Sequence, residues 1–397
     1  MIKRVLYMGL IYFLYFFVLL LIGCERNDNN EILNLGYGKL SIPTVDISSL
    51  YSRHVIIEQG NDTNRQGHSS TILMPDNKTM FVIWTIGHGG PCGPLKKSVD
   101  GGLSWSDKII TPNNWQYHAN CPPLYYLRDP EGYSRLFTFV SRGPYGKKMY
   151  FSYSEDNGNT WTPFEPLMIQ GTLDTLSATI MPFTSIIPIE NGGRLLAATN
   201  INDPYDKSGT TSVIAKSYSS DGGFTWSEWE VIFEKFSFFP AEPEIIRSPD
   251  GNQLLMITRE NNREYSSWIL LSNDEGMTWT VPVQAPESLK MDRHQACYSP
   301  DGRLVIAGRD VSEDSPSYSH LVAWVGTYED LLEGNEGEYR IKLLHSHIGT
   351  AEYPGLEVLP DGTFIATSSV SYRRDENYSV VSTRFNLEEI DNFLKVK

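Results

Sequence analysis

Basic residues, and charge in general, are scarce in this 397-residue chain. Lysine and arginine total 33 against 48 aspartate and glutamate residues, so the formal net charge is −15, and charged residues make up only 20% of the chain. A nucleic-acid groove needs a positive field to attract phosphates, so this balance excludes nucleic acid as a partner. The hydrophobic fraction of 40% is enough to bury a core and excludes an intrinsically disordered chain. A small-molecule or glycan ligand is therefore favoured.

The sequence also lacks the short motifs that mark nucleotide-binding folds and serine hydrolases. It has no phosphate-binding glycine loop, no dinucleotide fingerprint and no Ser/His/Asp spacing of the acyl-transfer kind. It has instead 32 glycines and 23 prolines spread along its length. Such a distribution indicates many turns and hence many short strands.

Cysteine is rare, with four residues in the chain. Cys92 and Cys121 both lie in loop sequence rich in glycine and proline, and in an exported protein such cysteines commonly pair. We therefore expect a Cys92–Cys121 disulfide. Cys297 lies within a strand pattern, where we expect a small buried hydrophobic residue.

A long apolar run is present at the N-terminus. Lys3 and Arg4 precede uncharged residues 5–23, which have the charged start and apolar core of a secretory signal. The run ends in Leu-Ile-Gly-Cys24, which resembles a bacterial lipobox and is followed at once by polar residues. The resemblance implies that residues 1–23 are removed, that Cys24 is lipidated, and that this lipid is the only membrane contact, at the bacterial outer membrane. The alternative is an uncleaved membrane anchor, because 19 apolar residues are long enough to span a bilayer.

Internal repeats appear after this segment. An eight-residue motif, Ser-x-Asp-x-Gly-x-Ser/Thr-Trp, occurs four times, at Ser98–Trp105, Ser154–Trp161, Ser219–Trp226 and Ser272–Trp279. Serine and aspartate side chains accept hydrogen bonds from the turn's own backbone, glycine takes the positive φ, and tryptophan packs the turn against the protein. The motif therefore reports on architecture.

A second periodicity gives the number of units. Six short turns separate pairs of apolar strands, around Asp76, Glu131, residues 190–192, Asp250, Asp301 and Asp361. Six units of about four strands each predict an all-β, six-bladed propeller occupying residues 51–397, with residues 24–50 as a linker. His54–Ile57 is expected to pair with Ser379–Phe385 to close the ring, and residues 386–394 to add a short helix.

The repeat also predicts which residues face the central mouth. The first strand of each blade is innermost, and its start lies eight residues before the turn carboxylate, at His68, Pro123, Glu242, Arg293 and Tyr353. The second strand returns to the same face some eight or nine residues after the turn, at Trp84, Arg259, Arg309 and Ser369. A tyrosine, a glutamate, a histidine and three arginines are thus predicted to converge.

The four motifs and the blade count resemble the Asp boxes and propeller of the sialidase superfamily, over almost the whole chain after residue 54. Within that resemblance, the segment from Glu242 to Arg259 is similar to the one that carries the base and a triad arginine. Tyr353-Pro-Gly is similar to the segment bearing the tyrosine nucleophile, and Arg309 falls where another triad arginine stands. The resemblance implies an exo-glycosidase acting on a terminal anionic sugar, with Arg259 and Arg309 binding the sugar carboxylate and Arg293 as a further ligand. No cofactor and no metal are implied.

Three positions depart from the sialidase pattern. His68 stands where the first triad arginine is expected, the loop at residues 85–91 lacks the usual acidic proton donor, and Ser369 replaces a glutamate. His88, in that loop, or His68 is then expected to donate the proton, because histidine can do so near neutral pH.

Two other functions fit the same fold. A lyase acting on uronate polysaccharide would use His68, His118, Tyr117, Tyr353 and Arg259. A non-catalytic glycan-binding propeller would stack sugars on aromatic residues at its mouth, namely Trp84, Trp115, Tyr117, Phe183 and Tyr353.

Overall fold

The fold is described from a computed structural model, which covers residues 33–396 except for 37, 39, 62, 145–147, 172–179, 204–210 and 233–237. The expected signal segment and the lipidation site Cys24 lie outside the described residues. Residues 34–397 form one unit built almost entirely of β-strands. In the part of the chain that is described, no helix combines the length and apolarity needed to cross a membrane.

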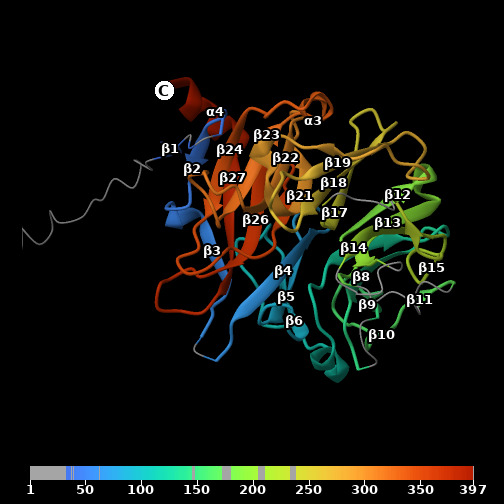
Figure 1. Cartoon of the computed structure of the whole chain (residues 1–397). Coiled ribbons are helices and arrows are strands. Elements are labelled where there is room, and N and C mark those ends of the chain that lie inside the picture. Colours follow the sequence, from blue (N-terminus) through green and yellow to red (C-terminus); the bar gives the residue numbers. More distant parts are fainter. Residues whose placement is uncertain are drawn as a thin grey trace, which may run out of the picture. The chain divides into compact units, whose positions relative to one another are not determined.

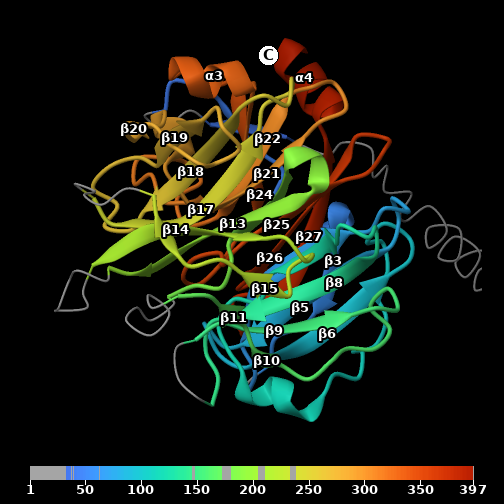
Figure 2. The ribbon, with the colours of Figure 1, turned by 90° about the vertical axis from the view of Figure 1, so that its right-hand side faces the viewer.

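Six antiparallel sheets succeed one another along the chain as the blades of a propeller (Figures 1 and 2). Blade 1 contains β4 (Gln66–Leu73), β5 (Met80–Ile86) and β6 (Cys92–Ser98). Blade 2 contains β7 (Leu124–Arg128), β8 (Ser134–Val140), β9 (Tyr150–Ser154) and β10 (Glu165–Pro166). Blade 3 contains β12 (Ser185–Ile189), β13 (Arg194–Asn202), β14 (Ser212–Ser219) and β16 (Glu230–Val231). The first strand of each blade lies at the centre, as the repeat predicts.

The second half of the chain repeats this arrangement. Blade 4 contains β17 (Pro240–Arg247), β18 (Leu254–Glu260), β19 (Trp268–Ser272) and β20 (Val283–Gln284). Blade 5 contains β21 (Met291–Tyr298), β22 (Leu304–Asp310), β23 (Leu321–Gly326) and β24 (Tyr339–Leu344). Blade 6 contains β25 (Gly355–Val358), β26 (Thr363–Val370) and β27 (Ser379–Asn386), with β3 (His54–Glu58) as its outermost strand.

Few elements lie outside the blades. A parallel pair, β11 (Met168–Ile169) and β15 (Thr225–Trp226), links blades 2 and 3. The described residues include two α-helices, α3 (Tyr328–Glu333) and α4 (Leu387–Val396), and short 3₁₀ turns at Tyr51–Arg53, Asn113–Tyr117, Glu190–Gly192 and Glu287–Leu289. Helix α4 lies where the sequence predicts a C-terminal helix.

The ring closes through β3, as predicted. In its antiparallel pairing with β27, Val55 lies opposite Ser382 and Ile56 opposite Val381. A strand that precedes blade 1 in sequence thus completes blade 6, and Figure 1 shows β4 of blade 1 beside the β26 and β27 strands of blade 6.

The propeller begins earlier than predicted. Residues 34–46 were expected to be part of a linker, but β1 (Asn34–Gly36) and β2 (Thr44–Asp46) extend the sheet of blade 5, with β2 parallel to β24. Val45 and Ile47 are fully buried. Two strands of three residues are too short to show a periodic pattern, so this segment resembles linker sequence.

The Asp boxes fold as expected of turn motifs. In the third box the Asp221 Oδ1 atom accepts hydrogen bonds from the backbone N–H groups of Phe224 and Thr225, and the Ser219 hydroxyl accepts one from Gly223 N–H. Gly223 has φ of 105°, where a side chain would be strained. Trp226 donates from its indole to the Gly223 carbonyl and packs between blades 2 and 3 with Phe183.

Candidate active site

The inner strands of blades 1, 4 and 5 carry the same irregularity at their mouth end. The strand register shifts between Gly67 and Ser70 in β4, between Ala241 and Glu244 in β17, and between Asp292 and Gln295 in β21. The first residue of each bulge has a positive φ, at His68 (31°), Glu242 (54°) and Arg293 (55°). Such backbone costs on the order of 1 kcal/mol for a residue other than glycine, and bulges commonly redirect side chains at functional sites. Three predicted site residues are placed by this one device.

Tyr353, just before β25, contacts Glu242 directly. The phenol donates a short hydrogen bond to Oε1 of Glu242, and Oε2 accepts one of 3.0 Å from Nη1 of Arg259. Burial raises the pKa of Glu242, but the Arg259 and Arg293 charges outweigh it and hold the pKa below its usual value. Burial and the adjacent Glu242 raise the pKa of Tyr353 well above that of free phenol. The resting pair is therefore a neutral phenol and an ionised carboxylate, as a nucleophile and its base require.

A buried carboxylate that the sequence analysis missed, Asp292, holds three arginines together. Its two oxygens lie 2.8 Å from Arg259 Nε, 2.8 Å from Arg263 Nη2 and 2.5 Å from Arg309 Nη2. Arg309 also donates from Nη1 to the Ala351 carbonyl at 3.0 Å. The guanidinium groups of Arg259 and Arg309 converge as predicted, but much of their donor capacity is already used within the protein.

A second missed carboxylate, Glu352, directly precedes Tyr353. It accepts a 2.6 Å hydrogen bond from the backbone N–H of His68, forms an ion pair with Arg65, and lies 3.4 Å from His88 Nδ1. Burial opposes ionisation of this carboxyl, yet the hydrogen bond from His88 and the charges nearby hold its pKa at about 2. Glu352 is thus an anion at working pH.

His68 is fixed in one tautomer. Its Nδ1 accepts a hydrogen bond of 3.0 Å from the Gly89 N–H, so the neutral ring carries its proton on Nε2. That Nε2 atom is buried and has no hydrogen-bond partner among the described residues. Burial lowers the pKa of His68 to about 4, and the ring stacks on Tyr353 with centroids 4.5 Å apart. His68 is therefore a neutral donor facing the tyrosine.

His68, His88 and Glu352 also offer ligand atoms within 4.8 Å of one another, so a metal ion has to be considered. A metal-binding histidine normally donates from its second ring nitrogen to an acceptor. Here the second nitrogen of His68 already accepts a hydrogen bond from the Gly89 N–H. Binding a cation at Nε2 would require an imidazolate, so this donor set does not fit a divalent metal.

The prediction of Trp84 as a mouth residue is wrong by one position. Strand pairing places Thr85 opposite Gly67, as Arg259 lies opposite Ala241 and Arg309 opposite Asp292. Because neighbouring residues of a strand point to opposite faces, Trp84 is fully buried, with its indole donating to Gln66.

Most of the other predicted aromatic and histidine positions are packed within the blades. His118 is a structural residue, packed on Tyr150 and Phe164 with its Nδ1 2.8 Å from the Asn114 carbonyl. Trp115 and Phe183 are fully buried, and Tyr117 is exposed. The lyase set that includes His118 is therefore not assembled, and most of the proposed aromatic mouth is core.

The predicted disulfide is absent. Cys92 and Cys121 are both free. Cys92 points into the core of blades 1 and 2, whereas the Cys121 thiol faces the mouth, 3.2 Å from His68 Nδ1. Cys297 lies in β21 as predicted, and is partly buried.

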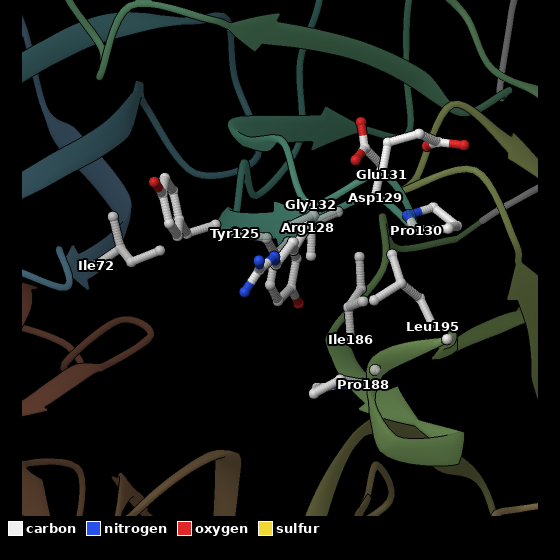
Figure 3. Close-up of a pocket in the computed structure, with 14 residues that line it drawn as sticks. Ile72, Tyr125, Arg128, Asp129, Pro130, Glu131, Gly132, Ile186, Pro188 and Leu195 are labelled. Carbon is white, nitrogen blue, oxygen red and sulfur yellow. The ribbon is translucent and has the colours of Figure 1, made fainter.

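The converging residues line a small cavity that contains His68, Ser69, Ser70, Cys121, Pro122, Pro123, Arg293, Tyr353 and Pro354. A larger hollow lies at the far ends of the inner strands, around Arg128, Glu131 and Pro188 (Figure 3). Neither the phenol–carboxylate pair nor the buried arginines contribute to it. We therefore place the candidate active site at the mouth.

Comparison with known proteins agrees with the repeat analysis. Residues 96–364 match the BNR repeat-like domain family. A sialidase of Paraclostridium sordellii is 27% identical over 179 residues, and the match spans 40% of this chain and 43% of that protein, less than half of its length.

Solved structures share the fold at low identity. An α-L-arabinofuranosidase of Fusarium graminearum, solved with arabinobiose, has a TM-score of 0.60 at 14% identity, covering 85% of this chain and 98% of that one. A Hadza microbial sialidase has a TM-score of 0.59 at 13% identity, covering 85% and 69%.

The buried histidines predict how stability depends on pH. Burial lowers the pKa of His54, His68 and His294 to about 4 and that of His320 to about 3. Below about pH 6.5 these histidines are protonated in the unfolded chain but stay neutral in the native one. The free energy of unfolding therefore falls as pH is lowered from about 6.5 to 4. Urea unfolding of His68→Gln should lose about 2 kcal/mol less than the parent between pH 7 and 5. An identical pH dependence would show that His68 is not kept neutral.

Proposed function

The chain belongs to the BNR repeat-like family of sialidase-type propellers, and we propose that it is an exo-acting glycosidase that removes a terminal anionic sugar. The observation that carries this proposal is the hydrogen bond between the Tyr353 phenol and Glu242 at the mouth. A phenol of ordinary pKa is a poor nucleophile, and a buried carboxylate beside it can activate it by accepting its proton.

In the proposed reaction the Tyr353 oxygen attacks the anomeric carbon while Glu242 accepts the phenolic proton. The bond from the sugar to its leaving oxygen breaks, and a covalent glycosyl–tyrosine forms. Arg259, 3.0 Å from Glu242, stabilises that carboxylate before the transfer and orients it. Water then attacks the anomeric carbon and gives one proton to the group that protonated the leaving oxygen, while the glycosyl–tyrosine bond breaks and Glu242 returns its proton to the phenolate.

His88 is the group best placed to protonate the leaving oxygen. Its side chain is 62% exposed, unlike that of His68, and lies 3.4 Å from the ionised Glu352. A carboxylate at this position can accept a hydrogen bond from the ring and orient it. His68 is excluded from this role because its low pKa leaves it neutral.

The charge around the mouth favours an anionic substrate. Five arginines, Arg65, Arg259, Arg263, Arg293 and Arg309, accompany three ionised carboxylates, Glu242, Asp292 and Glu352. Burial raises the pKa of a fourth, Glu244, to about 8, so that it is neutral at pH 7. The mouth is thus locally positive within an acidic protein.

Substitution of the pair tests the proposal. Tyr353→Phe and Glu242→Gln should each lower kcat on a sialylated oligosaccharide by about 10²–10⁴-fold, because each removes a group used in bond formation. Tyr133→Phe, at an exposed tyrosine in the turn between β7 and β8, is the matched control and should keep the parent rate. Released sugar and ultraviolet absorbance are measured together on sialylated glycans, arabinan and uronate polysaccharide.

Two results would overturn the assignment. A Tyr353→Phe protein with parental turnover would exclude the nucleophile. Appearance of an unsaturated, ultraviolet-absorbing uronate would assign the site to a lyase.

The role of His88 is tested with leaving groups of different basicity. For His88→Gln we expect kcat to fall about 10²–10⁴-fold on oligosaccharides, whose leaving group is a sugar hydroxyl that must be protonated. On nitrophenyl glycosides kcat should fall less than about tenfold, because nitrophenolate leaves without protonation. Equal losses on both substrates would contradict a proton-donating role.

We further propose that the protein is exported and anchored by a lipid on Cys24, on the basis of the apolar segment and lipobox-like residues before it. In a Gram-negative host, metabolic palmitate labelling should mark the parent and the Cys92→Ala control, and should be absent from Cys24→Ala. Labelling of the Cys24→Ala protein would reject the lipid anchor.

A further inference from the structure

Two buried hydrogen-bond donors without partners flank the ring of Tyr353. The Nη1 atom of Arg293 and the Nε2 atom of His68 are both inaccessible and form no hydrogen bond within the described part of the chain, and Oε2 of Glu352 lies 3.7 Å from His68 Nε2, beyond hydrogen-bond distance. His68 stacks on the tyrosine, and the Arg293 guanidinium lies 5.9 Å from the centroid of that ring. The two residues are 2% and 8% exposed. Buried donors are seldom left unpaired, so this arrangement points to an acceptor supplied from outside.

The other mouth arginines differ from Arg293 in this respect. Arg259 contacts Glu242 and Asp292, and Arg309 contacts Asp292 and a backbone carbonyl. Asp292 therefore already occupies the position between these two arginines that a bound carboxylate would take. The guanidinium N–H groups that contact Asp292 are therefore not free to bind a substrate carboxylate.

Arg293 forms no ion pair within the described part of the chain, although its charge acts on Glu242 at longer range. No carboxylate of the described residues lies within ion-pair distance of it, although acidic groups pair with all the other arginines named at the mouth. A buried guanidinium that makes no ion pair is only partly compensated, so its presence at the mouth points to a ligand that supplies an acceptor there.

We propose that Arg293 and His68 together form the subsite that binds the carboxylate of the acidic sugar, beside the Tyr353 nucleophile. Arg259 and Arg309 are then positioning residues, which hold Glu242 and Asp292 in place. This inference rests on the proposed glycosidase function and specifies which residues select its substrate.

The chemistry of the two donors suits a carboxylate. Arg293 supplies the positive charge, and His68 supplies a neutral N–H whose direction is fixed by the Gly89 contact. Both side chains project from equivalent bulges, in β21 and β4, and both line the same cavity. Blades 5 and 1 adjoin blade 6 on either side, so the subsite straddles the strand end that bears Tyr353.

The test compares an acidic glycoside with its neutral methyl ester. A nitrophenyl glycoside of sialic acid and the ester of the same compound differ only in the charge of the carboxyl group. For Arg293→Met we expect kcat/KM on the acid to fall about 100-fold through KM, and on the ester to change less than about threefold. His68→Gln, which retains an N–H donor, should keep more activity on the acid than His68→Leu. Arg194→Met, an exposed arginine of blade 3, is the control for loss of charge.

Stability distinguishes a binding role from a structural one. Removing a buried charge that is only partly compensated should leave the thermal unfolding temperature of Arg293→Met unchanged or higher in the absence of ligand. A marked decrease in that temperature, or equal losses of activity on acid and ester, would overturn the subsite assignment.

Binding without turnover separates the two proposals. Calorimetry with the Tyr353→Phe protein should show free sialic acid binding more tightly than its methyl ester, and this preference should vanish in Tyr353→Phe/Arg293→Met. A preference that persists in the double variant refutes the subsite even if hydrolysis is found. A preference that depends on Arg293, in a parent protein that hydrolyses no glycoside, refutes the glycosidase proposal and leaves the subsite in place.

Discussion

Everything at the mouth depends on closing six sheets into a ring. Closure is made by backbone hydrogen bonds between β3 and β27, strands separated by more than 300 residues, and the seam it leaves lies between blades 6 and 1. The candidate site crosses this seam. Tyr353 and Glu352 come from the blade 6 side, and His68 from blade 1, where its backbone N–H binds Glu352. The site is therefore assembled only when the ring closes, because no single blade carries all of its residues.

Electrostatics at the site are organised in two layers. Asp292 and Glu352 lie buried and hold arginines or histidines in fixed positions, whereas Glu242 and Tyr353 form the reactive pair. A buried carboxylate that contacts three guanidinium groups costs desolvation, which the several charges together offset. The result is a set of donors and acceptors whose orientation is fixed before any sugar arrives, as electrostatic stabilisation of a transition state requires.

Much of this follows from the sequence, and the failures have physical causes. The Asp boxes and hairpin turns repeat, so they predicted the blade number, the closing strand and the convergence of His68, Glu242, Arg293 and Tyr353. The prediction failed at Trp84, where counting from a turn of variable length slipped by one residue and chose the wrong face of β5. Asp292 and Glu352 were missed although each directly precedes a predicted mouth residue, because burial of a charged side chain leaves no periodic trace. The disulfide failed because loop composition does not say which way a thiol points.

The bulges on β4, β17 and β21 place mouth side chains without involving them in strand pairing. At each bulge the strand pairing resumes on both sides of the register shift, although the side chain at the bulge differs. A histidine, a glutamate and an arginine occupy equivalent positions in three blades without altering blade geometry. Exchange of these residues over evolution can therefore redirect the scaffold toward a different sugar while its packed core stays constant. Equivalent positions in three blades thus carry different side chains on the same local backbone, and His68, Glu242 and Arg293 are the three examples.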